Sequence, residues 1–539
     1  MKPIPLRFLT QSFDTVVGPQ MLFSHLTDNG HQVNSLLLES GEPGANGCDK
    51  SILITESALV ISGFGLKLIL EAKTANGRAI LKNFHCQTAT VVEKTENRLE
   101  LHCQGPSRAM EHQERLLDKN LFSPLRELMQ CLKPHDQPSA YATQLAGAFG
   151  YELIDAFENL PAHQKESNTV PDLYLLLPES RIIYDHQHHL QRIEQLVVFE
   201  KEDETRYHHA TQKIRHLCIE ICNIESKNNE QSTESNNPTH RNDPATEELS
   251  VNLSDDEFIQ IVLQCKDYIK QGEVFQIVPS RYFNLSCPEP LNAYKQLSKT
   301  NPSPYQFYLC GEQFTLFGAS PESAVKFSAK NRIVDLYPIA GTVKRGRDLM
   351  GKINQDEDNR LECALRLDKK EQAEHMMLVD LARNDIARLS KTGTRYVSQL
   401  LQVDRYSHVM HLVSRVEGIL EDEFDALHAY QACCNMGTLT GAPKLRASEL
   451  IRQLESTKRS FYGGAIGYLD ALGNLDTAIV IRSALVENSV AKITAGAGVV
   501  ADSDPLSEAN ETRQKAMAVI SAISQTQIES SSEHMHAAS

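Results

Sequence analysis

The sequence predicts an α+β fold, and two observations support this expectation. Short runs rich in aromatic and β-branched residues follow one another directly, for example at Tyr305–Leu309 and Ala324–Phe327. Amphipathic helical stretches lie before and after these runs, at Asp255–Gln271 and Lys370–Leu389. Adjacent strands mixed with helices are typical of α+β proteins, because a parallel α/β sheet would instead need strict alternation of strand and helix.

Before residue 226 the pattern is weaker. Three apolar runs, Ser35–Leu38, Ser51–Thr55 and Leu173–Leu177, predict buried strands with helical stretches between them. From 226 to 248 the chain is rich in Asn, Ser, Thr, Glu and Pro and nearly lacks large apolar residues. Such a composition cannot bury enough surface to order itself, so it predicts a linker or mobile loop.

After this segment the elements are clearer. The helix at 255–271 begins with acidic residues and carries apolar side chains at helical spacing. Asp504 and Pro505 predict the start of a last helix, with Asp as N-cap and Pro in the first turn. Further strands are expected at 274–283, 314–318, 333–339, 463–469, 477–486 and 491–500. The chain thus divides into an N-terminal region 1–225, a linker or mobile loop 226–250, a region 251–525 and a polar, flexible tail 526–539.

The composition excludes several classes of protein. With 41% hydrophobic and 23% charged residues, the chain resembles an ordinary globular protein. A net charge of −16 argues against nucleic acid as a partner, because that binding depends on clustered Lys and Arg. No apolar run is long enough to span a membrane, and the N-terminus lacks the apolar core of a signal peptide. We therefore expect a cytoplasmic protein.

Two predicted helices each carry a pair of glutamates three residues apart. Glu371 and Glu374 share one helix face, and Glu508 and Glu511 share another. A solvated helix face explains either pair alone. Two such pairs near glycine-rich strands also indicate oxygen ligands for a hard cation such as Mg²⁺.

Arg482 and His411 both lie in apolar stretches. A buried arginine needs a partner, either a core carboxylate or the carboxylate of a ligand. A histidine in this setting is either a core residue with satisfied hydrogen bonds or a group for proton transfer. Gly496-Ala497-Gly498 allows close approach of backbone N–H groups to an anion and lacks the third glycine of a dinucleotide loop. The residues alone thus indicate metal-assisted chemistry on a small anionic substrate.

Read together, these residues resemble the chorismate-utilising enzymes, most closely the anthranilate synthase component I family. The likeness covers nearly the whole chain. The matching segments include GEVFQIVPSR (272–281), FTLFGASPES (314–323), YPIAGT (337–342), EHMMLVDLARND (374–385), NMGTLTGAPK (435–444) and EANETRQKA (508–516). The resemblance implies a large mixed fold, in which antiparallel sheets pack as a sandwich with flanking helices.

The resemblance also implies the site residues and their roles. Mg²⁺ would be bound by Glu371, Glu374, Glu508 and Glu511 and would hold the ring carboxylate of chorismate. Chorismate would contact Gly341, Thr342, Tyr462, Arg482, Gly496, Ala497, Gly498 and Lys515. The catalytic residues would be Glu322, His411 and Thr438.

The implied reaction is the first committed step of tryptophan biosynthesis. Glu322 would protonate the departing C4 hydroxyl while ammonia adds at C2, because hydroxide is a poor leaving group. Thr438 would line the pocket. His411 would help to remove a proton as pyruvate leaves and the ring aromatises to anthranilate.

Two positions distinguish the branches of the family. Aminodeoxychorismate synthases carry a lysine nucleophile where this chain has Ala340, and isochorismate and salicylate synthases carry a water-activating lysine where it has Gln276. Neither side chain can perform those roles. The sequence therefore favours anthranilate synthesis, with aminodeoxychorismate synthesis as the alternative.

The N-terminal region resembles the family's tryptophan-binding element. On its own, the strand that ends in Glu39-Ser40 would be taken as an ordinary strand terminus. With the family context, tryptophan would be bound by Glu39, Ser40, Lys50, Pro304, Tyr305 and Gln306. We expect feedback inhibition, with 1–225 as the regulatory region and 251–525 as the catalytic region.

The source of ammonia is expected to lie outside the chain. No glutamine amidotransferase signature is present, so the resemblance implies a separate glutaminase subunit, anthranilate synthase component II. An alternative from another class is a catalytically inactive, tryptophan-sensing scaffold. The presence of both glutamate pairs together with Glu322, His411 and Arg482 argues against that alternative.

Overall fold

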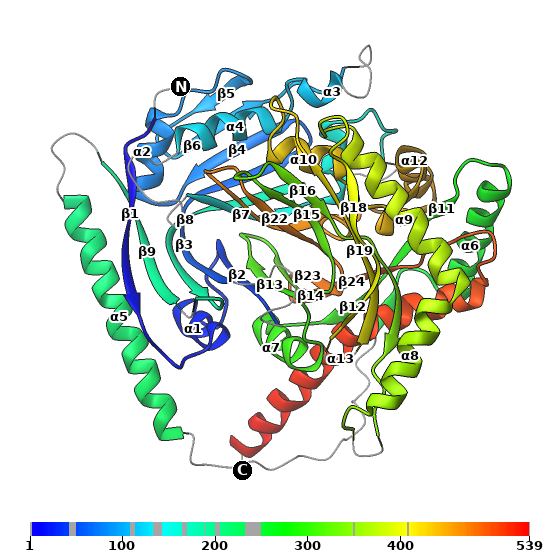
Figure 1. Cartoon of the computed structure of the whole chain (residues 1–539). Helices are drawn as coiled ribbons and strands as arrows, with labels where there is room; N and C mark the ends of the chain where they lie inside the picture. The colour runs from blue at the N-terminus through cyan, green and yellow to red at the C-terminus, as the bar shows by residue number, and fades with distance from the viewer. Residues whose placement is uncertain are drawn as a thin grey trace.

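The computed structural model describes residues 3–41, 50–107, 114–132, 143–163, 170–188, 190–199, 205–231, 249–348, 351–406 and 409–537, with side chains omitted at 227–231 and 528–537. Within these ranges, no helix has the length and apolar character that a bilayer crossing needs. The expected α+β class is confirmed, because a large antiparallel sheet is flanked by helices (Figure 1).

The main sheet is one continuous hydrogen-bonded network that closes on itself, in place of two separate sheets. Its N-terminal strands are β1 (Leu6–Phe13), β2 (Ser35–Glu39), β3 (Lys50–Phe64), β4 (Lys67–Ala72), β5 (Thr90–Lys94), β6 (Arg98–His102), β7 (Gln144–Phe149), β8 (Leu173–Asp185) and β9 (Leu190–Val198). Its C-terminal strands are β10 (Ser250–Val251), β12 (Ser280–Ser286), β13 (Tyr305–Cys310), β14 (Thr315–Ser320), β15 (Ser323–Ser328), β16 (Ile333–Leu336), β17 (Ile339–Lys344), β18 (Tyr396–Arg405), β19 (Val409–Ile419), β21 (Ala465–Asp470), β22 (Leu475–Ile479), β23 (Ser483–Glu487) and β24 (Val490–Gly496). A small separate sheet pairs β11 (Gln276–Ile277) with β20 (Gly441–Ala442).

The N-terminal and C-terminal regions share this sheet. β2 pairs with β13, so that Leu38 lies opposite Phe307. β7 pairs with β21, so that Gly147 lies opposite Gly467. Apolar side chains from the N-terminal and C-terminal strands form one buried cluster. They come from β2, β3, β7, β8, β13, β14, β21 and β23. The two regions are therefore continuous in space.

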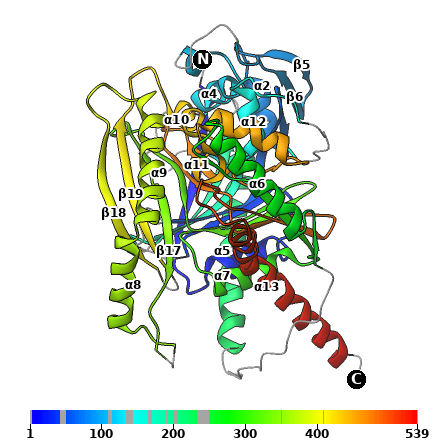
Figure 2. The same cartoon turned by 90° about the vertical axis from the view of Figure 1, so that its right-hand side faces the viewer.

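Helices flank the sheet on several sides (Figures 1 and 2). They are α1 (Pro19–Leu26), α2 (Ala75–Asn83), α3 (Glu114–Leu117), α4 (Phe122–Cys131), α5 (Thr205–Gln231), α6 (Asp255–Lys270), α7 (Pro290–Thr300), α8 (Gln355–Leu367), α9 (Lys369–Ala387), α10 (Ala426–Cys433), α11 (Gly437–Thr440), α12 (Lys444–Leu454) and α13 (Pro505–Ala537), with a 3-10 turn at Tyr151–Ala156. As expected, Asp504 caps α13, because its carboxylate accepts from the Ser507 N–H at 2.9 Å.

Three strands predicted as single runs are divided in two. Pro279 separates β11 from β12, and Pro338 separates β16 from β17, because proline lacks the N–H that a ladder needs. The run 477–486 is divided between β22 and β23 at Arg482, whose φ is +50°.

Parts of the predicted linker and tail are helical. Helix α5 continues to Gln231, so residues 226–231 are helical, and 232–248 lie outside the described residues. Helix α13 continues to Ala537, so the backbone of most of the predicted flexible tail is helical.

Candidate active site

Two candidate site residues, Glu322 and Arg482, lie where two strand pairs of the sheet meet. β14 pairs with β23, and β15 pairs with β22. The loop between β14 and β15 carries Glu322, and the loop between β22 and β23 carries Arg482. Backbone hydrogen bonds cross this junction, from Ala319 N to Arg482 O at 3.1 Å and from Ile479 N to Glu322 O at 3.0 Å. The junction therefore fixes the backbones of both candidate residues.

Glu322 is a buried carboxyl group with few polar neighbours. Its side chain is 8% exposed, and its Oε1 accepts a hydrogen bond from the Thr438 hydroxyl at 3.1 Å. Burial raises the pKa of Glu322 to about 7, while the Thr438 hydrogen bond and the charges of Lys515 and Arg482 act in the opposite direction. A carboxyl group with this pKa can hold a proton near neutral pH and give it up.

His411 lies directly opposite Thr342 on the paired strands β19 and β17. The Thr342 hydroxyl lies 2.9 Å from Nδ1 of His411. Burial, with a smaller contribution from the Arg482 charge, lowers the pKa of His411 to about 4. The imidazole is therefore neutral around pH 7 and can accept a proton, which is the protonation state that a base requires.

Arg482 does not form the core ion pair that was one explanation of its position. No hydrogen bond or ion pair joins its guanidinium to any residue in the described ranges. Burial lowers its pKa, and the charges of Tyr462, Glu511 and Glu322 favour its charged form. An arginine cation in such surroundings is suited to a ligand carboxylate.

A glycine-lined wall lies beside Arg482. A Cβ added to Gly496 would come within 3.1 Å of the Tyr462 hydroxyl, and one added to Gly498 within 2.8 Å of Gln276 Nε2. Ala497 between them is fully buried. Larger residues at the two glycine positions would therefore fill the space between this wall and its neighbours.

Lys515 joins this wall to the acidic residues of α13. Its Nζ donates to the carbonyl of Gly496 at 3.0 Å and forms an ion pair with Glu511 at 2.6 Å. Burial raises the pKa of the nearby Tyr462 phenol to about 12, while the charge of Arg459 acts in the opposite direction. Lys515 thus touches both Gly496 of the glycine wall and Glu511 of α13.

The four glutamates come from two helices, α9 and α13, and lie close enough for their charges to interact. Burial raises the pKa of Glu371, Glu374 and Glu508, and their mutual negative charges raise it further. Glu508 is 5% exposed, and its Oε2 has no hydrogen-bond partner among the described residues. No three His, Cys, Asp or Glu side chains in the described ranges are gathered into a metal-ligand set. The glutamates thus influence one another without forming a closed ligand shell.

Gly341 places strand β17 against the first turn of α9. Its φ is +85°, a conformation that favours glycine. A Cβ here would lie 3.1 Å from Oε2 of Glu371 and 3.0 Å from Leu365. Gly341 of β17 and Glu371 of α9 are therefore close neighbours.

A second cavity, of about 270 Å³, lies between the N-terminal and C-terminal strands. Five of the six residues predicted to bind tryptophan line it, and Pro304 does not. The full lining is Leu38, Glu39, Ser40, Lys50, Ile52, Tyr305, Gln306, Phe307, Ile466, Gly467, Tyr468, Asp476 and Ala478. The sequence reasoning missed the wall from β21 and β22, because only the long-range pairing of these strands brings it there.

Several polar groups in this cavity lack partners. The Ser40 hydroxyl and Gln306 Nε2 are buried and form no hydrogen bond with any described residue. The Tyr294 hydroxyl donates to Glu39 at 2.5 Å, and burial raises the pKa of Glu39. Because buried polar groups are nearly always hydrogen-bonded, the unpaired groups indicate a site for a polar ligand.

Comparisons with known proteins agree with these features. The family model for chorismate binding enzymes matches residues 87–521. Anthranilate synthase component 1 of Vibrio cholerae is 46% identical over 524 residues, which are 97% of this chain and 97% of that protein. The crystal structure of anthranilate synthase component I from Streptococcus pneumoniae has a TM-score of 0.63 at 29% identity, covering 88% of this chain and 93% of that chain.

The fold extends to a more distant relative. The menaquinone-specific isochorismate synthase from Escherichia coli has a TM-score of 0.62, covering 97% of this chain and 95% of that chain. Its identity is 16%, so it shows a shared fold alone. The near full-length match to curated relatives, the family model and the shared fold lead to one conclusion: this chain belongs to the chorismate-binding enzyme family, in its anthranilate synthase component 1 group.

Proposed function

We propose that this chain converts chorismate to anthranilate with ammonia as the nitrogen donor, as the first committed step of tryptophan biosynthesis. The observation that carries the proposal is Glu322, a buried carboxyl group with a pKa of about 7 beside Thr438 and the cation of Arg482. The chain is 46% identical to an anthranilate synthase component 1, and Glu322 is an acid of the kind that the first chemical step needs.

In the first step, ammonia bonds to C2 of chorismate, the ring double bond shifts, and the C4–O bond breaks. Glu322 gives its proton to the departing oxygen, so that water leaves in place of hydroxide. Arg482 and Lys515 bind the carboxylates of the substrate, and the backbone at Gly496 and Gly498 comes close to it because no side chain intervenes.

In the second step, the proton at C2 is removed, the enolpyruvyl group leaves as pyruvate, and the ring becomes aromatic. His411 is neutral near pH 7 and is held by Thr342 at Nδ1, which leaves Nε2 to take part in proton removal. The proton passes from carbon to the imidazole or to a water that it binds.

Magnesium suits the acidic face formed by α9 and α13. Glu371, Glu374, Glu508 and Glu511 would hold the ion, and the unpaired buried Oε2 of Glu508 supports this assignment. Burial, and in smaller part the charges of neighbouring carboxylates, raises the pKa of Glu371, Glu374 and Glu508, and a bound cation would relieve the repulsion. When bound, Mg²⁺ supplies positive charge to a substrate carboxylate.

Tryptophan is the proposed ligand of the second cavity. Its walls combine apolar side chains such as Ile52 and Phe307 with the unpaired groups of Ser40 and Gln306. An amino acid with a large aromatic ring presents matching chemistry, with a ring for the apolar wall and charged ends for the polar one. Feedback inhibition would follow if the ligand favours an arrangement with a weaker active site.

Ammonia is proposed to come from a separate glutaminase subunit, anthranilate synthase component II, in the cytoplasm. The 539-residue sequence has no glutamine amidotransferase signature. The chain alone is therefore expected to use free ammonia and not glutamine.

The test is anthranilate fluorescence from the purified chain with chorismate, Mg²⁺ and ammonium, with and without tryptophan. Fluorescence that requires Mg²⁺ and falls with tryptophan would support both the reaction and the regulation. Consumption of chorismate without fluorescence would point to an aminodeoxychorismate or isochorismate product, and no consumption would favour the scaffold alternative.

A further inference from the structure

Helix α8 lies next to the acidic helix α9 and is joined to it without a linker. Asp368 ends α8, and its carboxylate caps α9 by accepting from the backbone N–H groups of Lys370 and Glu371. Glu371 therefore lies in the first turn after the junction. Asp368 therefore connects the end of α8 with Glu371, the first of the candidate metal-binding glutamates.

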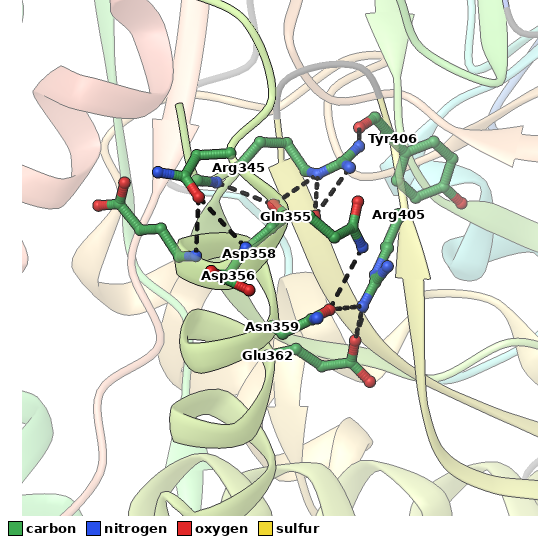
Figure 3. A network of polar contacts seen from close by, with 11 residues as sticks. Arg345, Gln355, Asp356, Asp358, Asn359, Glu362, Arg405 and Tyr406 are labelled. Atoms are coloured by element: carbon green, nitrogen blue, oxygen red, sulfur yellow. Dashed lines mark hydrogen bonds and ion pairs between the residues drawn. The ribbon is translucent and has the colours of Figure 1, made fainter. Parts of the chain in front are cut away.

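A buried ion pair fixes α8 to the end of strand β17. Arg345 Nε donates to Asp358 Oδ1 at 2.9 Å, and Arg345 Nη2 donates to Asp358 Oδ2 at 2.8 Å (Figure 3). The backbone N–H of Gly346 also donates to Oδ1 at 2.8 Å. Asp358 is fully buried, and the Arg345 hydrogen bonds hold its pKa below the usual range. Such a planar, two-point contact restricts both distance and orientation.

The third contact of the same guanidinium reaches the β18–β19 hairpin. Arg345 Nη1 donates to the carbonyl of Tyr406 at 2.5 Å, and the Tyr406 N–H donates to Val409 O at 2.9 Å. The Tyr406 ring lies 5.5 Å from the His411 ring, centre to centre. Arg345 thus joins three elements that each carry site residues: β17 with Gly341 and Thr342, α8–α9 with the glutamates, and the hairpin with His411.

We propose that Arg345 is a positioning residue for the amination of chorismate, which holds the α9 glutamates in register with the substrate-binding residues of β17 and β19. This inference rests on the proposed function. The Arg345 guanidinium binds Asp358 and Tyr406, neither of which is a proposed ligand of substrate or metal. Its loss should loosen the relation between the metal-binding and substrate-binding elements while the reacting groups stay intact.

A second ion pair on the same helix and the same hairpin provides a matched control. Arg405 Nη2 donates to Asn359 at 2.9 Å and pairs with Glu362 (Figure 3). The Arg405 side chain is 34% exposed, compared with 13% for Arg345. A surface pair of this kind contributes little, because water and salt screen it. Arg405→Gln therefore removes an arginine from the same interface without removing the buried clamp.

The experiment compares the wild type, R345Q, R345K and R405Q. Binding of Mg²⁺ is measured by calorimetry without chorismate, and anthranilate formation is measured over a range of Mg²⁺ concentrations. For R345Q we expect the dissociation constant and the half-saturating concentration of Mg²⁺ to rise by about 10-fold or more, the range for residues that orient metal ligands. At saturating Mg²⁺ and chorismate, kcat should fall less than about 3-fold, because bound Mg²⁺ and chorismate restore the arrangement of the α9 glutamates and the substrate-binding residues. R345K should lie between the wild type and R345Q, because lysine keeps the charge and loses the two-point contact.

The double variant R345Q/D358N covers the case in which R345Q folds poorly. It removes both charges, so no unpaired carboxylate is left buried. It should show the same weakening of Mg²⁺ binding as R345Q, with a melting temperature closer to that of the wild type. The inference is overturned if the Arg345 variants bind Mg²⁺ as tightly as R405Q does, or if they lose kcat and melting temperature with no change in Mg²⁺ affinity. A wild type that forms no anthranilate with Mg²⁺ would instead overturn the proposed function.

Discussion

Ile479 donates its backbone N–H to the carbonyl of Glu322 at 3.0 Å, which joins the proposed general acid to strand β22. Asp476 and Ala478 of the same strand line the cavity proposed for tryptophan. The two sites therefore share one strand. A ligand that displaces β22 acts on the backbone of the acid without a rearrangement of separate domains.

Replacing Ser40 by phenylalanine should make the enzyme less sensitive to tryptophan. The side chain would project into a cavity of about 270 Å³ and occupy space that the ligand needs. We expect the tryptophan concentration for half-inhibition to rise on the order of 10-fold or more, which corresponds to ~1.4 kcal/mol of binding free energy. The measurement is a tryptophan titration of anthranilate formation, with the exposed Ser12→Ala as control. Unchanged sensitivity of S40F would contradict the assignment of the cavity.

Replacing Glu322 by glutamine should remove the acid of the first step. We expect kcat to fall on the order of 10²- to 10⁴-fold, the usual contribution of general acid catalysis. In the wild type, the acid form is present below the pKa of about 7, so kcat/KM should fall as the pH rises through that value. The concentration of unprotonated ammonia must be held constant across the profile, because it rises with pH on its own.

Thr438→Val tests the same assignment by moving the pH profile. The Thr438 hydroxyl donates to the Glu322 carboxylate and lowers its pKa, so its loss should raise that pKa. The decline of kcat/KM should then begin at higher pH than in the wild type. A profile that stays in place would show that the titrating group is not Glu322.

The same buried acid should make the folded protein less stable at high pH. The pKa of Glu322 is raised from 4.5 to about 7, so the folded state binds more protons than the unfolded state between these values. Stability is therefore lost as the pH rises through this window. E322Q should be more stable than the wild type at about pH 8, by up to about 3 kcal/mol, and equal to it at about pH 4. Thermal unfolding without Mg²⁺ measures the difference, and Glu96→Gln, on an 80% exposed side chain, is the surface control.

Glu508→Gln should weaken the binding of Mg²⁺. The change keeps the size of the side chain and removes the charge from the buried Oε2 that has no described partner. We expect the half-saturating concentration of Mg²⁺ to rise on the order of 10-fold or more. Mg²⁺ should also raise the melting temperature of the wild type more than that of E508Q, because a ligand that binds only the folded state stabilises it. If Mg²⁺ raises the melting temperature of both proteins equally, the assignment of Glu508 to the metal site is wrong.

The sequence predicted the fold class and the local elements well where a single segment carries the signal. The helix at 255–271 appears as α6, because Ser254 and Glu257 form a capping box at its start. The strands at 305–309 and 324–327 appear as β13 and β15. These elements depend on residues within about one turn or one strand of each other, which is the range over which periodicity and capping act.

Features that depend on distant contacts were not predictable in this way. The division of 477–486 at Arg482 results from the meeting of two strand pairs, and nothing in the apolar run indicates it. Asp476 enters the cavity proposed for tryptophan only because β22 joins the same sheet as β2. The Arg345–Asp358 pair spans a strand end and a helix, and its residue types alone would fit any surface ion pair.

The pairing of β2 with β13 and of β7 with β21 has a consequence for how the gene can be divided. A chain cut between residues 232 and 248 would yield two pieces, each with unpaired strand edges, and exposed edges recruit other strands. Neither piece should fold alone, yet the cut interrupts none of the described strands. Co-expressed halves should therefore reassemble into a working enzyme. If each half is fused to one member of a pair of binding proteins, anthranilate fluorescence would report when that pair brings the halves together.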